Sequence, residues 1–465
     1  MFQLLVNMLR DVGEGLTIAF WHQPVRFFGT KRRQLRDVFS GLHPSTNVAI
    51  YTGVLWLIPT VMVDQYKSLY LNHLGVSAGE LGVYNSITQL ILLFSALAGG
   101  YLADAWGRRK TTNVFDSLSW ALPALLLAVA PNKWFGVAAV LLYGFNMGAN
   151  VSYNCLLVEK NSAQKRPDVY TVLQLVNMSP SLVFLPFLAG WWVDHAGLET
   201  AVRWMYGLFF TLVVVGIWSR FKWLEDDRPR GQTPTRALKD ILRGERGEYL
   251  SALREFFSRP ASKAMFFSRL IDEWMMAFWL LYVPLYMVHR LGLPAGDIAR
   301  VNQFAVFLGF ASLLLVIPAI HKTRGYRMIG YEQLVAGLAV LVLPLGGRYP
   351  VFWVCFASQA VSALAGTFFW TFTAAAWANM LEGSQRPRML AGCYALMRVF
   401  LVPAGLLAAY LYAEIAPEVL LGLVAFLRLV NAVLLRRVSA VLSPMIEKDG
   451  RIEWKDAKIE GAVGR

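Results

Sequence analysis

Apolar runs of roughly 20 residues recur along the chain, separated by short polar or charged segments. A helix of about 20 apolar residues crosses the ~30 Å hydrocarbon layer of a bilayer. The strands of a membrane barrel would instead alternate apolar and polar residues, and the chain shows no such alternation. The pattern predicts an all-α integral membrane protein with twelve transmembrane helices, at residues 47–71, 80–104, 112–131, 134–158, 168–193, 199–221, 262–287, 296–320, 327–346, 350–380, 388–412 and 417–437.

Basic residues gather on one side of the predicted membrane. If both termini are cytoplasmic, most of the 44 Lys and Arg residues fall in the termini and in the loops placed inside. Basic loops stay cytoplasmic under the positive-inside rule, so we expect a multi-pass protein of the inner or plasma membrane with both termini inside. Anionic lipid headgroups account for the net charge of +14, and no nucleic acid is expected as a partner.

The chain contains an internal duplication. Leu-Gly-Val-Ser-Ala-Gly-Glu-Leu at 74–81 matches Leu-Gly-Leu-Pro-Ala-Gly-Asp-Ile at 291–298, and each stretch joins the first helix of one half to the second. The predicted layout is an interfacial amphipathic segment on the cytoplasmic side (1–46), a six-helix bundle (47–222), a cytoplasmic central loop (223–261), a second six-helix bundle (262–437) and a cytoplasmic tail (438–465).

A motif follows the second predicted span. Residues 100–110 read Gly-Tyr-Leu-Ala-Asp-Ala-Trp-Gly-Arg-Arg-Lys. This stretch resembles the signature loop of the major facilitator superfamily (MFS), G-x-L-A-D-[RK]-x-G-R-[RK], and departs from it at Ala105, where that family usually carries a base. The resemblance covers roughly residues 47–437. It implies the MFS fold, with two six-helix halves packed as repeats around a site at the midplane, and the activity of a secondary transporter whose subfamily is unassigned.

The resemblance also implies a gate at the cytoplasmic face. Asp104 is expected to meet the start of the eleventh helix, where a helix N-terminus stabilises a carboxylate. Arg108 and Arg109 are expected to reach the acids that bracket the same corner, and the alternative is that they only anchor to lipid phosphate. The predicted gating motif comprises Gly100, Asp104, Gly107, Arg108, Arg109, Asp116 and Glu159.

Charged side chains enter two predicted spans of the C-terminal half. A charge at a helix centre costs ~2.5–3.5 kcal/mol on insertion scales, so it normally faces a partner or a wet cavity. Arg269, Asp272 and Glu273 lie in the seventh span, and Arg398 lies at similar depth in the eleventh. One base facing two acids leaves a carboxylate free to bind a proton or a cationic group. A structural ion pair that locks this half is the alternative.

Other polar residues inside the spans leave a similar choice. Asp64 and Lys67 share a helix face near the outer end of the first span, which favours a local salt bridge over a role in substrate or proton binding. Amides on the fourth and fifth spans either line the cavity or join helices by hydrogen bonds. The candidate substrate or proton cavity comprises Asp64, Lys67, Asn150, Asn154, Gln174, Asn177, Arg269, Asp272, Glu273, Trp370 and Arg398.

Several classes of protein are disfavoured by missing motifs. The three cysteines and six histidines show no metal-ligand spacing, and no phosphate-binding loop or nucleophile elbow occurs. We therefore expect no enzyme, no cofactor and no metal. The sequence predicts a monomeric transporter, in contact with membrane lipids, that moves a small organic solute by alternating access, with proton-coupled export as the favoured mode. A membrane sensor or a lipid-moving protein on the same fold is the alternative.

Overall fold

The computed structural model describes residues 42–158, 184–225, 245–311, 322–380 and 386–442, together with Val169, Val172, Leu173, Val176 and Asn177. Within these residues all regular structure is helical and no strand occurs. Seven helical segments are long and apolar enough to cross a membrane. The predicted all-α membrane class is thereby confirmed. The count of twelve spans is not established, because parts of several predicted spans lie outside the described residues.

The helices fall into two sets that follow the order of the chain. The N-terminal half contains α3 (Pro44–Val63), α4 (Lys67–His73), α5 (Ala78–Trp106), α6 (Arg108–Asp116), η1 (Ser117–Ala121), α7 (Leu122–Ala128), α8 (Lys133–Tyr143), α9 (Asn146–Val158), α11 (Leu185–Ala196) and α12 (Leu198–Trp223). The rest of the chain contains α14 (Glu245–Ser258), α15 (Pro260–Leu285), η3 (Tyr286–Arg290), α16 (Ala295–Ala311), α17 (Lys322–Val342), η6 (Leu343–Gly347), α18 (Val351–Met380), α19 (Arg386–Tyr410), η7 (Leu411–Ile415) and α20 (Pro417–Leu442).

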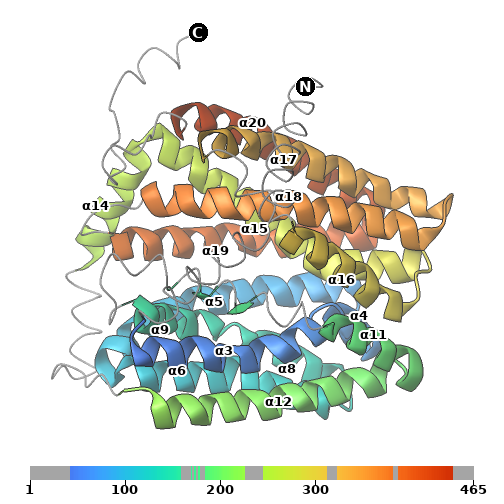
Figure 1. Ribbon diagram of the computed structural model, residues 1–465, viewed down its shortest axis with the longest axis horizontal. Helices are drawn as coiled ribbons and strands as arrows, with labels where there is room; N and C mark the ends of the chain where they lie inside the picture. The colour runs from blue at the N-terminus through green and yellow to red at the C-terminus, as the bar shows by residue number, and fades with distance from the viewer. Residues whose placement is uncertain are drawn as a thin grey trace, which may run out of the picture.

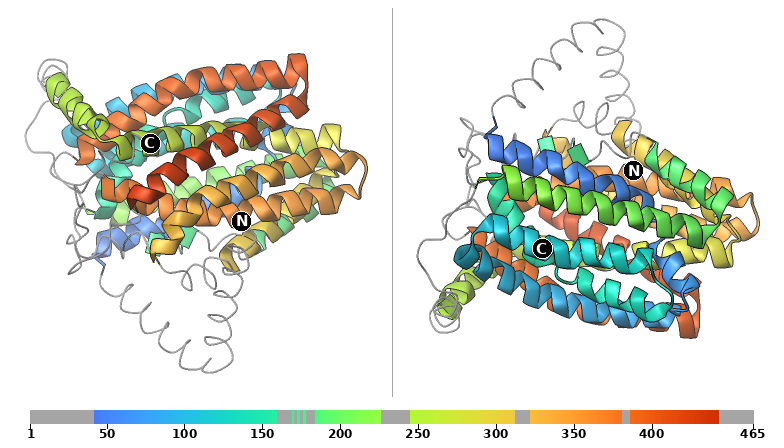
Figure 2. Two further views of the ribbon diagram at one scale, coloured as in Figure 1. Left: turned by 90° about the horizontal axis from the view of Figure 1, so that it is seen from above. Right: turned by 90° about the horizontal axis from the view of Figure 1, so that it is seen from below.

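The two halves lie side by side with their long helices running in similar directions (Figure 1). Seen from above, the C-terminal half faces the viewer, and seen from below, the N-terminal half does (Figure 2). The most extensive contact between the halves joins α5 to α19, and a second joins α11 to α16. The α11–α16 contact lies at one end of the molecule and α14 lies at the opposite end (Figure 1). We call these the α11–α16 end and the α14 end.

The duplicated stretches adopt matching turns. Gly75 and Gly292 both have a positive φ, +94° and +72°, a conformation that favours glycine because it lacks a Cβ. Each glycine stands shortly before a helix, α5 or α16. Ser77 and Glu80 cap α5 reciprocally, which satisfies backbone N–H groups that a helix start leaves unpaired. The shared geometry supports the duplication, and the domain boundaries proposed from it remain predictions.

Large apolar side chains cover the outside of the bundle. Phe94, Trp204, Trp218 and Trp353 each expose more than half of their surface, between 55% and 66%. Contiguous apolar surface of this kind is rare on a protein surrounded by water. A lipid environment removes its cost, so the exposed surface agrees with the membrane assignment made from the apolar runs.

Candidate functional site

The first predicted span is broken where its two charges lie. α3 ends at Val63 and α4 begins at Lys67, so residues 64–66 form a turn in place of a continuous helix. No side chain within the described ranges forms a hydrogen bond or ion pair with the Asp64 carboxylate, and the expected salt bridge to Lys67 is not formed. Lys67 instead holds its ammonium 4.7 Å from the centre of the Tyr143 ring, a cation–π contact.

A second pair of charges comes from the C-terminal half. Nη1 of Arg398, on α19, lies 3.5 Å from Oε2 of Glu273, on α15. The same nitrogen donates a hydrogen bond of 3.0 Å to Oε1 of Gln89, on α5. The sequence left two acids as partners of Arg398, and the structure places Glu273 there. Gln89 belongs to the other half, so this hydrogen bond crosses the junction.

Tyr143, at the end of α8, lies between the two pairs. Its hydroxyl is within electrostatic reach of Asp64, Glu273 and Arg398. Its ring packs edge-on against Trp120, with 5.2 Å between the ring centroids. Tyr143 therefore lies near charged side chains of both halves. We call Asp64, Lys67, Glu273 and Arg398 the central charge cluster.

Two members of this site, Gln89 and Tyr143, were not predicted from the sequence. Gln89 lies in the second predicted span, after the polar residues Asn85, Ser86 and Thr88 and before an apolar run, and a polar group inside the membrane is a usable signal because its burial is costly. Tyr143 gives no comparable signal. The chain has 18 tyrosines, and nothing in the sequence around Tyr143, inside the fourth predicted span, distinguishes it from the others.

Asp272 faces a different environment from Glu273. Its carboxylate lies 3.9 Å from Nη1 of Arg269, one turn back on α15, and within electrostatic reach of Arg428 on α20. Arg428 donates a hydrogen bond of 3.3 Å to Gln333 on α17. Consecutive residues on a helix point about 100° apart, so the two adjacent acids serve separate networks. Asp272 belongs to the packing of α15, α17 and α20 within one half.

Asp116 does not join the arginines of the loop motif, contrary to the expected gating motif. Its Oδ2 lies 2.7 Å from Nη1 of Arg220, on α12, in a pair that is almost fully buried. Nε of Arg220 donates to the Thr52 hydroxyl at 3.0 Å. The guanidinium also lies 4.0 Å from the centre of the Trp56 ring and 4.8 Å from that of Tyr153. This arrangement fastens α6, α9 and α12 to α3.

The remaining loop residues adopt a defined turn. Gly107 has φ +86° and separates α5 from α6, which explains a glycine at that point of the motif. Nη1 of Arg109 donates to the backbone carbonyls of Phe221 and Leu224, at 3.1 and 3.0 Å, at the end of α12. Gly100 and Asp104 are backbone members of α5. The side chains of Asp104, Asn154 and Trp370, and all of Glu159 and Gln174, lie outside the described part of the chain.

The amides of the fourth predicted span bond along their own helix. Nδ2 of Asn150 donates to Oδ1 of Asn146 at 2.6 Å. Asn177 is half-buried. Neither observation decides between cavity lining and helix association, so that choice stays open. A third amide, Asn302 on α16, donates to Oε1 of Gln65 at 3.4 Å, which joins the turn at residues 64–66 to the other half.

The halves are also fastened together at the α11–α16 end. Nη2 of Arg300, on α16, lies 2.6 Å from Oδ2 of Asp194, on α11, and Arg300 also pairs with Asp297. The hydroxyl of Tyr282 donates to the carbonyl of Ala78 at 3.1 Å. A Cβ on Gly82 would collide with the backbone of α19, so glycine permits the close approach of α5 and α19 here.

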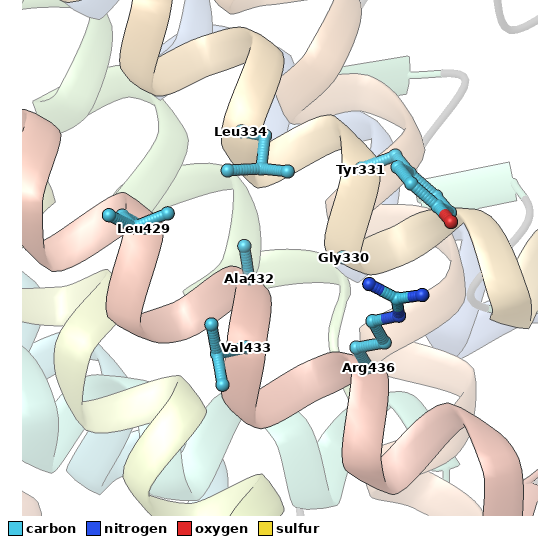
Figure 3. Close-up of a pocket in the computed structure, with 7 residues that line it drawn as sticks. All are labelled: Gly330, Tyr331, Leu334, Leu429, Ala432, Val433 and Arg436. Carbon is cyan, nitrogen blue, oxygen red and sulfur yellow. The ribbon is translucent and has the colours of Figure 1, made fainter. Parts of the chain in front are cut away.

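A small groove lies apart from these charges, between α17 and α20. Leu334, Leu429 and Val433 line it, with Arg436 at one end (Figure 3). Its volume is about 70 Å³, far below the ~300–1,000 Å³ of sites that enclose a small ligand. Neither its size nor its apolar lining suits the binding of a polar solute. The central charge cluster is therefore the better candidate for the functional site.

Fold and site together define a multi-pass helical membrane protein with a charged site between two repeated halves. A family model described as the Major Facilitator Superfamily matches residues 46–347. The chain therefore belongs to the Major Facilitator Superfamily, and it is a transporter rather than an enzyme. The family predicted from the loop motif is confirmed.

Solved transporters share this fold at low sequence identity. The chain matches a nucleoside transporter, NupG, with a TM-score of 0.60, 13% identity and coverage of 85% of this chain and 100% of that one. It matches a POT family transporter in complex with 5-aminolevulinic acid with a TM-score of 0.59 and 13% identity, over 87% of this chain and 97% of that one. It also matches a D-xylose-proton symporter with a TM-score of 0.59 and 14% identity, over 84% of this chain and 96% of that one. No curated protein matches the sequence. Identities this low establish the fold and leave the substrate open.

Proposed function

We propose that this protein carries a small organic solute across the cell membrane by alternating access, with the central charge cluster as its substrate site. The observation that supports this is Tyr143, which lies under the Lys67 ammonium and within electrostatic reach of Asp64 from one half and of Glu273 and Arg398 from the other. Repeat-built transporters bind substrate between their halves near the midplane. A site made by both halves can couple binding to their relative motion, because it changes when they rock.

The contacts at the α11–α16 end support one state of this cycle. We propose that the α14 end is cytoplasmic, because basic loops stay inside under the positive-inside rule; the α11–α16 end then faces outward. Arg300 with Asp194 and Tyr282 with Ala78 join the halves at that outer face. The structure then represents a carrier that is closed to the outside. We propose that both termini are cytoplasmic, that the protein acts as a monomer, and that lipids contact its apolar surface.

Purified protein in liposomes tests the transport proposal. A vesicle loaded with one solute should accumulate the same solute, radiolabelled, from outside by exchange, and Arg398→Ala should abolish this exchange. Lys222→Met is a matched control, because Lys222 lies in the last turn of α12, away from the cluster. If a broad panel of sugars, nucleosides, amino acids and organic acids shows no exchange, the chain acts as a sensor and the proposal fails. Exchange of labelled phospholipid alone would indicate a lipid-moving protein.

Asp64 bears on proton coupling. A carboxylate without a protein partner must find its counter-charge elsewhere, as a proton or as a cationic group of the solute. An imposed pH gradient should drive accumulation if Asp64 carries the proton. Asp64→Asn should then lose gradient-driven uptake and keep exchange. If the parent protein ignores the gradient, the cation of the solute is the remaining counter-charge.

We also propose that Asp104 closes the cytoplasmic gate when the carrier faces outward. The motif supports this role, because its acid and glycine stand where α5 gives way to α6. Asp104→Asn should fold normally and transport more slowly, since it weakens a contact present in only one state. A cysteine placed in the last turn of α5, in a background without the three native cysteines, should label faster from the cytoplasmic side. Unchanged flux together with unchanged labelling would contradict the gate.

A further inference from the structure

The central charge cluster contains a carboxylate and an ammonium that fail to neutralise each other. Residues three apart on a continuous helix lie about 5–6 Å apart at Cβ and readily pair. Here α3 ends before Asp64 and α4 begins at Lys67, and the two side chains lie within electrostatic reach without forming an ion pair. The Asp64 side chain keeps accessible surface, and Lys67 rests on the ring of Tyr143. Among the described residues, Asp64 and Lys67 therefore carry opposite charges without an ion-pair partner.

Arg398 is a third charged group near Tyr143, and the described residues do not use all of its N–H donors. A guanidinium carries five N–H donors in a planar fork. Nη1 is shared between Gln89, at 3.0 Å, and Glu273, at the longer distance of 3.5 Å. Nε of Arg398 is buried and has no hydrogen-bond partner among the residues that the structure describes. An unpaired buried donor is costly, and an anionic group of the solute would remove that cost. A carboxylate or phosphate can bind a guanidinium through two parallel hydrogen bonds.

The balance of charge decides which solutes fit. The cluster holds two acids and two bases, from both halves. A solute with only a positive charge would neutralise Asp64 and leave Lys67 without an anion, whereas Arg398 keeps Glu273. A solute with only a negative charge would compensate Lys67 and leave Asp64 without a cation. A neutral solute would compensate neither Asp64 nor Lys67. Leaving a charge uncompensated away from water costs several kcal/mol, so each of these solutes is selected against.

We propose that the central charge cluster binds a zwitterionic solute, with its ammonium on Asp64 and its carboxylate on Lys67 and Arg398. Tyr143 and Trp120 supply an aromatic surface for the apolar part that joins the two charged ends. This inference rests on the proposed transport function and adds the substrate class.

A matched series of solutes tests the proposal. The zwitterions are glycine, β-alanine, 4-aminobutanoate, 5-aminopentanoate and alanyl-alanine, which vary the distance between the two charges. Each has an N-acetyl counterpart without the cation and a carboxamide counterpart without the anion. At least one zwitterion should raise the apparent melting temperature of the purified protein, because a ligand of the native state stabilises it. Its two counterparts should bind at least about tenfold more weakly, the equivalent of ~1.4 kcal/mol or more.

Two variants should change the preference in opposite ways. Asp64→Asn should weaken binding of the zwitterion at least about tenfold and stop discriminating against the N-acetyl counterpart, while it still rejects the carboxamide. Lys67→Met should accept the carboxamide and still reject the N-acetyl compound. A variant that is merely damaged would weaken all three solutes alike, so the crossed pattern is diagnostic. Lys222→Met should behave as the parent.

Two results would contradict the proposal that the solute is a zwitterion. The zwitterion proposal fails if the parent protein binds the N-acetyl and carboxamide compounds as tightly as the zwitterions, or if no zwitterion stabilises it. These measurements use the parent protein, so they decide the question even if the variants do not fold. Exchange of a neutral solute in liposomes, with Asp64→Asn and Lys67→Met both active, would reject the zwitterion and keep transport. Absence of exchange for every solute would reject the proposed function itself.

Discussion

Two arginines in the membrane region of this protein, Arg220 and Arg398, differ in how completely other groups pair with them. Arg220 pairs with Asp116 at 2.7 Å, donates to Thr52 and lies between two aromatic rings. Arg398 shares one nitrogen between two acceptors and leaves Nε without a partner. Both are charged residues inside apolar helices. The number of partners, more than the depth of burial, separates a charge that holds the fold together from one that is available to a ligand.

The position of each arginine fits this distinction. Arg220 lies within the N-terminal half, where nothing has to move during transport. Arg398 lies at the junction and bonds to Gln89 across it, so its contacts change when the halves move. A fully satisfied ion pair at the junction would oppose that motion, since breaking a buried pair costs ~3–5 kcal/mol. Loose pairing at the junction and tight pairing within one half agree with a moving carrier made of two rigid parts.

The largest expected effect is on Arg220. Arg220→Ala leaves Asp116 as an uncompensated buried charge and should destabilise the protein by ~3–5 kcal/mol, or prevent folding. Arg220→Leu combined with Asp116→Leu should recover much of the loss, because apolar side chains replace the pair. Thermal unfolding in detergent measures both. Arg348→Ala, in an exposed turn, is the control. If Arg220→Ala changes the free energy of unfolding by less than ~0.5 kcal/mol, the size of an ordinary surface substitution, then Arg220 does not stabilise the fold and no longer differs from Arg398 in this respect.

Arg398 should show a smaller effect on stability and a larger one on transport. Arg398→Ala leaves Glu273 and Gln89 without their donor, which should cost ~1–3 kcal/mol. Adding Glu273→Gln should restore stability in part, and adding Asp272→Asn should not, because Asp272 belongs to the network of Arg269. Exchange in liposomes should be lost in all three proteins. Equal rescue by the two second changes would show that the acids are not separated as the structure places them.

The pair at the α11–α16 end should matter little for stability. Both Arg300 and Asp194 are about one-third exposed, and exposed ion pairs contribute ~0–1 kcal/mol. Arg300→Ala should instead favour opening at this end. With the native cysteines replaced, Gln65→Cys reports the opening, because Gln65 is buried beside Asn302. Its labelling from the outer face should accelerate in the Arg300→Ala protein. An unchanged labelling rate would exclude a role for this pair in closing that end.

The smallest effect on stability is expected at Asp64. Its carboxylate has no partner among the described residues, so Asp64→Asn removes no protein contact and should leave the melting temperature within about 2 °C, a shift of under ~1 kcal/mol. Solute exchange should nevertheless fall if Asp64 binds the ammonium of the solute, and should persist if Asp64 carries a coupling proton instead. A stability loss comparable with that of Arg220→Ala would show that Asp64 is a structural residue, and the contrast between satisfied and available charges would no longer hold for this site.

Some members of the site could be predicted because membrane burial makes each of them unusual. Asp64, Lys67, Glu273 and Arg398 are charges within apolar runs, and the cost of placing them there is a signal that one helix at a time can carry. Their pairing could not be predicted. The sequence favoured a salt bridge between Asp64 and Lys67 because it treated the first span as one helix. A turn at residues 64–66 interrupts that helix, and no glycine or proline marks that turn.

The partner of Asp116 could not be predicted from the sequence either. Its place in the sequence, just after the loop motif, suggested a role beside Arg108 and Arg109. In the structure it turns to Arg220, 104 positions away, because both side chains are enclosed by helices of the N-terminal half. Arg109 binds the carbonyl groups at the end of α12 instead. Proximity along the chain located the corner of the bundle correctly and assigned the wrong partner within it.

The sequence by itself determined the class of protein and the family. These follow from properties that accumulate along the chain: apolar length, the distribution of basic residues and a local motif whose glycine permits one backbone turn. Tertiary structure decided which charges are satisfied. The energy of a buried charge depends on the groups that surround it in three dimensions, and those groups come from helices far apart in sequence, such as α12 for Asp116 and α5 for Arg398.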